Sequence, residues 1–201
     1  PGRANRLTAR FTDLVMTGFR SAGEHFGGRA VHTGNPVRPT MRMLPRDEAR
    51  AELDLPEDMP VVLFLGGSQG ARALNDIALQ VPGNICLVLQ CGGRDLERVR
   101  EKAPGDKSIR IFDFVDDPAL LYSAADVAVA RSGAMTVAEL TRFQLPAFYV
   151  PYPFAADDHQ RYNAMEAAES GGARMFVQEE ISAGQLWKEL SELLKDPSVM
   201  E

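Results

Sequence analysis

The sequence predicts an α/β fold in which helices cover both faces of an open parallel sheet, and three observations indicate it. From residue 61 onward, short apolar runs alternate with segments of helical periodicity. The first run, VVLFL at residues 61–65, is apolar throughout, as expected of a strand covered on both faces. Turns that contain glycine, proline or acidic residues separate the runs, which is the pattern of right-handed βαβ units. The expected sheet is therefore Rossmann-like.

The first 60 residues are less regular. Four apolar side chains in residues 4–17 recur at helical spacing, so we expect one helix there. A short strand is expected at 30–33, before the GNP turn at 34–36, whose proline favours extended backbone in the residue before it. The following stretch is rich in proline and charge and holds one short helix at 46–53. We place a domain boundary or hinge near residues 36–40.

Beyond residue 60 each element follows from its pattern. Short apolar runs rich in valine, isoleucine and leucine predict strands, and the longer mixed runs between them predict helices. The expected strands cover residues 61–65, 85–90, 109–112, 126–130, 147–150 and 173–177. The expected helices cover residues 71–81, 94–103, 118–124, 134–143, 159–170 and 183–194.

Composition excludes several classes of function. The 201 residues are 45% hydrophobic and 25% charged, with a formal net charge of −6, so no basic footprint for nucleic acid is present. No apolar run reaches the roughly 18 residues of a membrane span, and no secretory signal opens the chain, so we expect a cytoplasmic location. Cys86 and Cys91 fall on one expected strand, about 16 Å apart, which is too far for a disulfide. They are expected to be small core residues.

Ligands of such sheets bind outside the carboxyl ends of the strands, so the loops at these ends carry the functional information. The loop after the first run of the alternation reads GGSQGA at residues 66–71 and precedes a helix. Its glycines allow close backbone approach, the helix start offers free N–H groups, and Ser68 adds a hydroxyl. This pattern favours a phosphate site formed by Gly67, Ser68 and Gln69. The alternative is a plain tight turn.

A second loop, RSGAMT at residues 131–136, again places a glycine at a helix start, which suits an anion. Glu139 lies one turn further along, where its carboxylate can accept hydrogen bonds from ribose hydroxyls. The alternative is that Glu139 only complements the helix dipole.

The third loop, PYPFAADDHQRYN at residues 151–163, ends at an expected helix start. Gln160 offers a donor and an acceptor together, which suits a sugar hydroxyl. Asp157 or Asp158 is expected to cap the helix, although the pair also resembles half a metal site. No His or Cys cluster at ligand spacing supports a metal, so none is expected.

The fourth loop, FVDD at residues 114–117, follows an expected strand. Its backbone N–H and C=O groups can pair with a flat base. An acidic cap for the helix near Pro118 is the alternative interpretation.

Taken together, these stretches resemble the MurG family of bacterial glycosyltransferases. The matching motifs are GNPVR at 34–38, GGSQGA at 66–71, FVDD at 114–117, RSGAMTVAEL at 131–140 and DDHQRYNA at 157–164. Each motif alone is weak, but their order and spacing across nearly the whole chain are specific. The family transfers N-acetylglucosamine (GlcNAc) from UDP-GlcNAc to lipid I, undecaprenyl-pyrophosphoryl-MurNAc-pentapeptide, and makes lipid II for peptidoglycan. It is inverting and works without a bound metal or other cofactor.

The resemblance implies a role for each motif within one half of a GT-B fold. Ser68 would contact the α-phosphate, the Val115 backbone would pair with uracil, and Glu139 would hold the ribose. Gln160, with His159 beside it, would bind GlcNAc hydroxyls. The remaining implied contacts to the nucleotide-sugar come from Arg38, Ala134, Met135, Thr136 and Asn163.

The resemblance also implies a domain division. Residues 1–37 would be the last helix and strand of the acceptor-side domain plus the hinge, and residues 38–201 would be a donor-binding domain truncated at its C-terminal end. The missing domain would hold lipid I, face the cytoplasmic side of the cell membrane as a peripheral protein, and supply the general base. His159 is the local candidate for that base, but we expect it to contact the sugar or support its loop. The fragment alone is expected to bind weakly and turn over little.

Two other functions stay open at this point. A UDP-sugar epimerase on the same scaffold would share the ribose carboxylate and need further carboxylates near the sugar, for which Asp157 and Asp158 are candidates. A non-catalytic nucleotide-sugar-binding fragment is the third hypothesis. In the first hypothesis the protein acts in cell-wall biogenesis, and hence in cell shape, cell division and the cell cycle.

Overall fold

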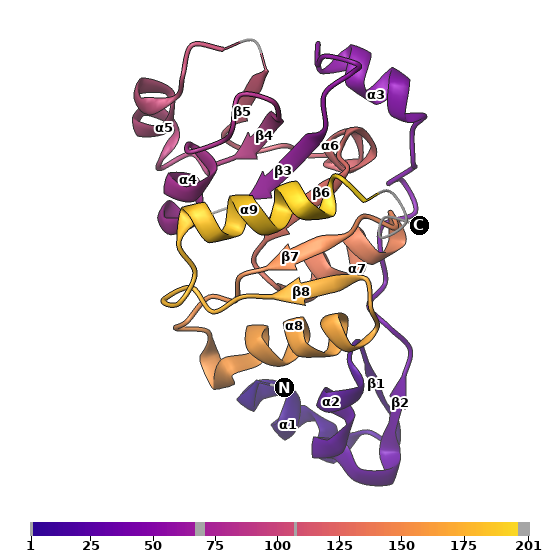
Figure 1. The fold of residues 1–201 in the computed structure, drawn as a ribbon. Helices are drawn as coiled ribbons and strands as arrows, with labels where there is room; N and C mark the ends of the chain where they lie inside the picture. The colour runs from indigo at the N-terminus through magenta and orange to yellow at the C-terminus, as the bar shows by residue number, and fades with distance from the viewer. Residues whose placement is uncertain (1, 67–70, 107, 197–201) are drawn as a thin grey trace.

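A six-stranded parallel sheet forms the centre of the computed structural model, which describes residues 2–66, 71–106 and 108–196 (Figure 1). The strand order is β5-β4-β3-β6-β7-β8, and every neighbouring pair is parallel. The strands are β3 (Val61–Leu65), β4 (Cys86–Gln90), β5 (Ile109–Phe112), β6 (Val127–Ala130), β7 (Ala147–Tyr149) and β8 (Ala173–Met175). The predicted open parallel sheet is confirmed.

Helices cover both faces, and the alternation of side chains along each strand explains why. On β3, Val61, Leu63 and Leu65 belong to one hydrophobic core while Val62 and Phe64 belong to the other, because successive side chains leave a strand on opposite faces. The first core is closed by α3 (Arg46–Glu52), α6 (Ala119–Ala124), α7 (Ala134–Arg142) and α8 (His159–Glu169). The second is closed by α4 (Arg72–Ala78), α5 (Leu96–Lys102) and α9 (Ala183–Leu193), with α9 in front in Figure 1.

The helix α9 packs against both the sheet and α4 in the second core. Trp187 packs on Phe64 with ring centroids 5.4 Å apart, and its indole N–H donates to the Ile77 carbonyl of α4 at 2.9 Å. Ser182 and Gln185 form a capping box that fixes where this helix begins. Cys86 and Cys91 are free and buried in different cores, as expected of small core residues.

A buried ion pair supports the amino ends of β3 and β6. The Arg50 guanidinium of α3 donates to Asp126 at 2.7 Å and to the carbonyls of Ala124, Glu57 and Met59. The Asp126 carboxylate also accepts from the Val61 N–H at 2.7 Å. The exposed fraction is 4% for the Arg50 side chain and 7% for that of Asp126. This contact holds α3 against the start of two central strands.

Residues 2–35, here called the N-terminal segment, form a separate layer beside α8 (Figure 1). Its elements are α1 (Arg3–Thr8), η1 (Ala9–Phe11), β1 (Val15–Thr17), α2 (Arg20–Gly23), η2 (Glu24–Arg29) and β2 (Ala30–His32). The strands β1 and β2 pair with each other in parallel and do not join the six-stranded sheet.

The predicted helix over residues 4–17 is wrong beyond its first turns. The α-helix ends at Thr8, and residues 15–17 form β1. The apolar side chains that suggested a helix face no core in this chain, because Leu7, Phe11 and Leu14 are all exposed. Their spacing therefore carried no information on periodicity, whereas the predicted strand at residues 30–33 is confirmed as β2.

Candidate functional site

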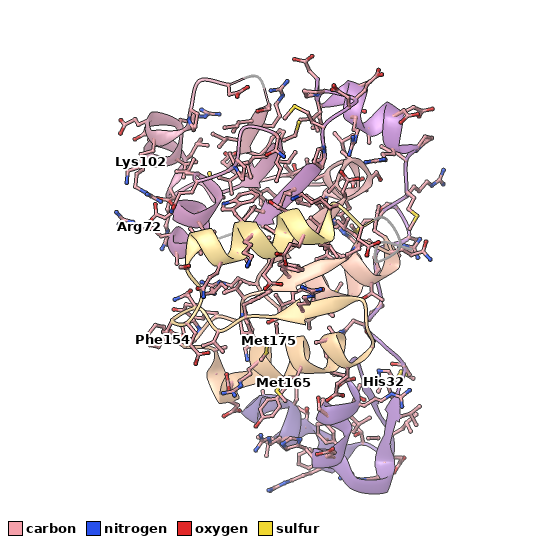
Figure 2. The ribbon with its side chains drawn as sticks, viewed as in Figure 1. His32, Arg72, Lys102, Phe154, Met165 and Met175 are labelled. Carbon is pink, nitrogen blue, oxygen red and sulfur yellow. The ribbon has the colours of Figure 1, made fainter. Side chains whose placement is uncertain are left out.

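The site lies where the strand order reverses. The chain runs from β3 outward through β4 to β5, then returns to pair β6 on the other side of β3. This places the carboxyl ends of β3 and β6 side by side, and such a topological switch point is where α/β sheets bind ligands. Figure 2 shows Arg72 and Phe154 on the side of the molecule to which the strands' carboxyl ends point. The loops predicted to act together therefore share one edge.

The loop after β3 begins at a glycine that no other residue can replace without displacement. A Cβ on Gly66 would lie 3.0 Å from both the Ala71 nitrogen and the Gln90 carbonyl oxygen. Ala71 is the cap of α4, and no side chain caps this helix. The predicted phosphate contacts Gly67, Ser68 and Gln69 lie outside the described residues.

The loop after β6 presents an uncapped helix start. Gly133 is the cap of α7, and it makes no side-chain capping bond. Ala134, Met135 and Thr136 are the first three helical residues, and the N–H groups at these positions have no partner within a helix. The N-terminal end of α7 thus offers backbone donors and a positive dipole end, which together suit an anion. Thr136 adds a hydroxyl beside Gly133.

Two residues of α8 brace this loop. The fully buried Ser132 donates through Oγ to the Gln160 carbonyl at 2.7 Å, and its own carbonyl accepts from Asn163 Nδ2 at 3.0 Å. The Oε1 of Gln160 accepts the Tyr152 N–H at 3.0 Å, which ties the loop after β7 to the same point. The loops at 131–136 and 151–160 are therefore one hydrogen-bonded unit, and the predicted residues Gln160 and Asn163 belong to it.

Arg131 also holds the loops after β6 and β7 together. Its guanidinium donates to the carbonyls of Val150 and Pro151 and to Gln178 Oε1, and lies 5.5 Å from the Tyr152 ring centroid. Burial lowers the pKa of Arg131 from its ordinary value, although Arg remains charged at neutral pH. A partly buried positive charge thus lies at the carboxyl end of β6.

The start of α8 differs from its predicted form. Asp158 occupies the cap position but makes no side-chain capping bond, so the predicted capping role of Asp157 or Asp158 is wrong. Both residues adopt left-handed backbone, with φ of 52° and 51°, whereas a capping residue typically has extended backbone. Their carboxylates lie 3.9 Å from Arg6 and Arg161 respectively. His159 is exposed, and its Nδ1 lies 2.7 Å from the Ala156 carbonyl.

Glu139 lies in the second turn of α7 and is held by a residue that sequence reasoning missed. The Tyr122 hydroxyl of α6 donates to Glu139 Oε2 at 2.9 Å. Burial first, and then the charge and hydrogen bond of Glu139, raise the pKa of Tyr122 well above its usual range, so it stays a donor at neutral pH. This contact fixes the rotamer of the carboxylate and leaves Oε1 for another donor. No sequence signal joined the two residues, which lie on different helices.

Arg38 and the FVDD loop complete this end of the site. Arg38 donates to the Asp116 carbonyl at 3.2 Å, and its positive charge acts on the Tyr122 phenol. Val115 packs partly against the core, and Asp117 accepts the Ala119 N–H at 3.1 Å, which supports the capping interpretation for that carboxylate. Arg38, the FVDD loop, Tyr122 and Glu139 form one cluster, and Ser132, Gln160 and Asn163 form the other. Ser132 precedes the first turn of α7 in the chain and Glu139 follows it, so this turn lies between the two clusters.

Within the described residues, no group of three or more His, Cys, Asp and Glu side chains is arranged to hold a metal ion. In the same part of the chain, no helix is long and apolar enough to cross a membrane.

Comparison with known families decides the class of this fold. The model of the glycosyltransferase family 28 C-terminal domain matches residues 61–201, which include all six strands of the main sheet. The chain belongs to glycosyltransferase family 28. This membership favours a transferase over the epimerase and over a non-catalytic module.

Curated relatives of this family 28 chain share one name, UDP-N-acetylglucosamine--N-acetylmuramyl-(pentapeptide) pyrophosphoryl-undecaprenol N-acetylglucosamine transferase. The relative from Halorhodospira halophila is 40% identical over 97% of this chain and 55% of its own length. Those from Aquifex aeolicus and Acetivibrio thermocellus are 35% and 32% identical over 98% of this chain. The chain spans about half the length of the relatives it matches.

Solved structures agree with this assignment. The crystal structure of Acinetobacter baumannii MurG is 27% identical and superposes with a TM-score of 0.71 over 99% of this chain and 56% of that one. A sucrose-phosphate synthase from Thermosynechococcus elongatus, 20% identical with a TM-score of 0.66, shows the shared fold alone. The predicted resemblance to the MurG family and the predicted GT-B half are therefore confirmed.

Proposed function

We propose that this chain is the donor-binding half of an inverting transferase that moves GlcNAc from UDP-GlcNAc to lipid I in peptidoglycan synthesis. The observation that carries the proposal is the uncapped start of α7 at the switch point, braced by Gln160 and Asn163 on one side and followed by the Tyr122–Glu139 pair on the other. The names of its family 28 relatives support the reaction.

The two clusters suit the two ends of a nucleotide-sugar. The diphosphate would meet the N–H groups of residues 134–136 and the loop after β3, as anions do at helix starts. The ribose hydroxyls would donate to Glu139, whose rotamer Tyr122 already fixes. The uracil would pair with the Val115 backbone, next to Arg38. The sugar would contact the amide nitrogen of Gln160, because its Oε1 is engaged by Tyr152.

The donor-binding half would contribute to the reaction by stabilising UDP as the leaving group. An acceptor hydroxyl would attack the anomeric carbon from the face opposite UDP, while the C1–O bond to the β-phosphate breaks. The charge that develops on the diphosphate would be met by backbone N–H groups and the α7 dipole, with the positive charge of Arg131 at the carboxyl end of β6. The general base would come from the acceptor-side half. His159 is exposed and is held against the Ala156 carbonyl, which supports a role in shaping its loop.

We also propose that residues 1–37 belong to the acceptor-side domain. A parallel two-stranded sheet is normally buried on both faces, whereas Met16 of β1 and Val31 of β2 are exposed in this chain. The longer relatives offer the sequence that would cover them. That domain would hold lipid I at the cytoplasmic face of the membrane, as a peripheral protein of cell-wall synthesis and cell division.

Calorimetric titration tests the donor site directly. We expect the chain to bind UDP and UDP-GlcNAc in preference to GDP and GDP-mannose. Glu139→Gln should weaken UDP binding by about tenfold, since a hydrogen bond to a charged group contributes about 1.5–3 kcal/mol. Glu101→Gln is the matched control, because Glu101 is an exposed carboxylate on α5. Equal affinity for uridine and guanosine nucleotides would refute the proposal.

A further inference from the structure

A carboxylate from α8 holds the N-terminal segment. The Glu166 carboxylate accepts the Arg20 N–H at 2.6 Å, the Ser21 N–H at 3.1 Å and the Ser21 hydroxyl at 2.9 Å. Glu166 and Ser21 lie 145 residues apart in the chain. Burial alone would raise the pKa of Glu166, but these hydrogen bonds outweigh it and the pKa lies below its ordinary value. The contact is therefore a charged one at neutral pH.

The same stretch of chain reaches the first turn of α7. Gly18, two residues before Arg20, packs so closely on Asn35 that a Cβ on it would lie 2.0 Å from Asn35 Oδ1. Asn35 Nδ2 in turn donates to the Ala134 carbonyl at 3.4 Å. Glu166 thus holds a turn that packs against Asn35, and Asn35 in turn contacts the start of α7.

Apolar packing joins the N-terminal segment to the main sheet over only part of their boundary, where Phe19 packs against the first core. A cavity of about 760 Å³ opens between the segment and the helices α7 and α8, with Arg20, His32, Arg142 and Glu169 among its lining residues. Figure 2 shows His32 on the N-terminal segment below α8. The hydrogen bonds of Glu166 cross the same boundary and are directional, so they restrict the angle between the two layers.

We propose that Glu166 is a positioning residue that sets the angle between the N-terminal segment and the donor site. In the whole protein this angle aligns the acceptor hydroxyl, held by the other half, with the anomeric carbon. Glu166 therefore controls turnover and leaves the donor affinity nearly unchanged. This inference rests on the proposed function, because alignment matters only where two halves hold two substrates.

The test uses the full-length protein with Glu166→Ala, Glu166→Gln and Ser21→Ala. We expect Glu166→Ala to lower kcat about tenfold or more, because small misplacements of reacting groups cost up to about a hundredfold in rate. Glu166→Gln keeps one acceptor oxygen and Ser21→Ala keeps both backbone contacts, so each should have a smaller effect. The Kd for UDP-GlcNAc should change less than about twofold in all three, since none of these residues is part of the donor site.

Hydrogen exchange gives a readout that does not depend on activity. Residues 15–21 and 30–35 should exchange faster in Glu166→Ala, while residues 127–142 should not. Glu169→Ala is the matched control, because Glu169 lies one turn further along α8, lines the same cavity and is exposed. It should behave as wild type in both measurements.

Three results would overturn the inference: wild-type kcat and exchange in Glu166→Ala, a parallel loss of donor affinity, or an equal effect of Glu169→Ala. If Glu166→Ala does not fold, Ser21→Ala decides, and unchanged kcat and exchange in that variant also overturn it. A wild-type protein that transfers no GlcNAc would refute the proposed function instead, and exchange would still report whether Glu166 holds the segment.

Discussion

Asp126→Ala should destabilise the chain far more than removal of any exposed carboxylate. The variant leaves the Arg50 guanidinium, whose side chain is 4% exposed, without its carboxylate, and leaves the Val61 N–H without its acceptor. Breaking a buried ion pair from one side costs about 3–5 kcal/mol. For a chain of this size that corresponds to a fall in Tm of roughly 10 °C.

Urea denaturation followed by circular dichroism measures this loss. Glu189→Ala is the matched control, because Glu189 in α9 also pairs with an arginine, Arg174 at 2.7 Å, but its side chain is 39% exposed. Exposed pairs contribute little, so the control should unfold close to wild type. UDP affinity well below the transition should persist in both variants, because Asp126 lies at the amino ends of the strands. A loss below about 1 kcal/mol in Asp126→Ala, or one no larger than in the control, would show that water reaches Arg50 and that the reasoning is wrong.

Three further outcomes are expected. Gly18→Ala should lower the free energy of unfolding, measured in urea, by about 1–3 kcal/mol, because its Cβ would lie 2.0 Å from Asn35 Oδ1. Gly83→Ala is the control: its Cβ meets no atom within 4 Å, so this variant should unfold like wild type. Equal effects of the two substitutions would contradict the prediction. Since the pKa of Glu166 is lowered, its contact stabilises the fold fully above about pH 4.5 and is lost as pH falls through the lowered pKa. Exchange of residues 20–23, corrected for intrinsic rate, should therefore rise as pH falls below about 4.5, and a rate that stays flat would contradict this. Trp187→Phe should lower the unfolding free energy by about 1–2 kcal/mol in the same assay, because the Ile77 carbonyl loses the indole donor and keeps only the Gln80 N–H, and the smaller ring packs less well on Phe64. A change within about 0.5 kcal/mol, the effect of a surface substitution, would argue against it.

The sheet was predictable because its strands are buried on both faces. A short run such as VVLFL has no polar face, so it fits neither an exposed strand nor an amphipathic helix, and its pattern indicates a buried strand. The structure places all six such runs in one parallel sheet. The edge that carries the loops followed from the same rule. The residues predicted in the loops after β6 and β7 lie at this edge for the same reason, although the distances between them could not be predicted from the sequence.

The predictions that were wrong or incomplete depend on features that a sequence pattern does not report. These features are contacts with residues distant in the chain and the local backbone conformation. Leu7 and Phe11 repeat like a helix but have no core to face in this chain. Asp158 has the side chain of a cap, but its backbone is left-handed and its carboxylate makes no capping bond. Tyr122 and Glu139 are joined across two helices, and no periodicity reports on such a pair.

The strand order has a consequence for how the chain can be assembled during synthesis. β3 is the first strand of the main sheet to leave the ribosome, and it ends up in the interior of the finished sheet. Each later strand adds to an edge that is still open, first on the β4 side and then on the β6 side. The sheet can therefore grow in the order of translation, without any strand being inserted between two that are already paired. The helix α9, which follows β8 in the chain, then packs on the finished sheet through Trp187.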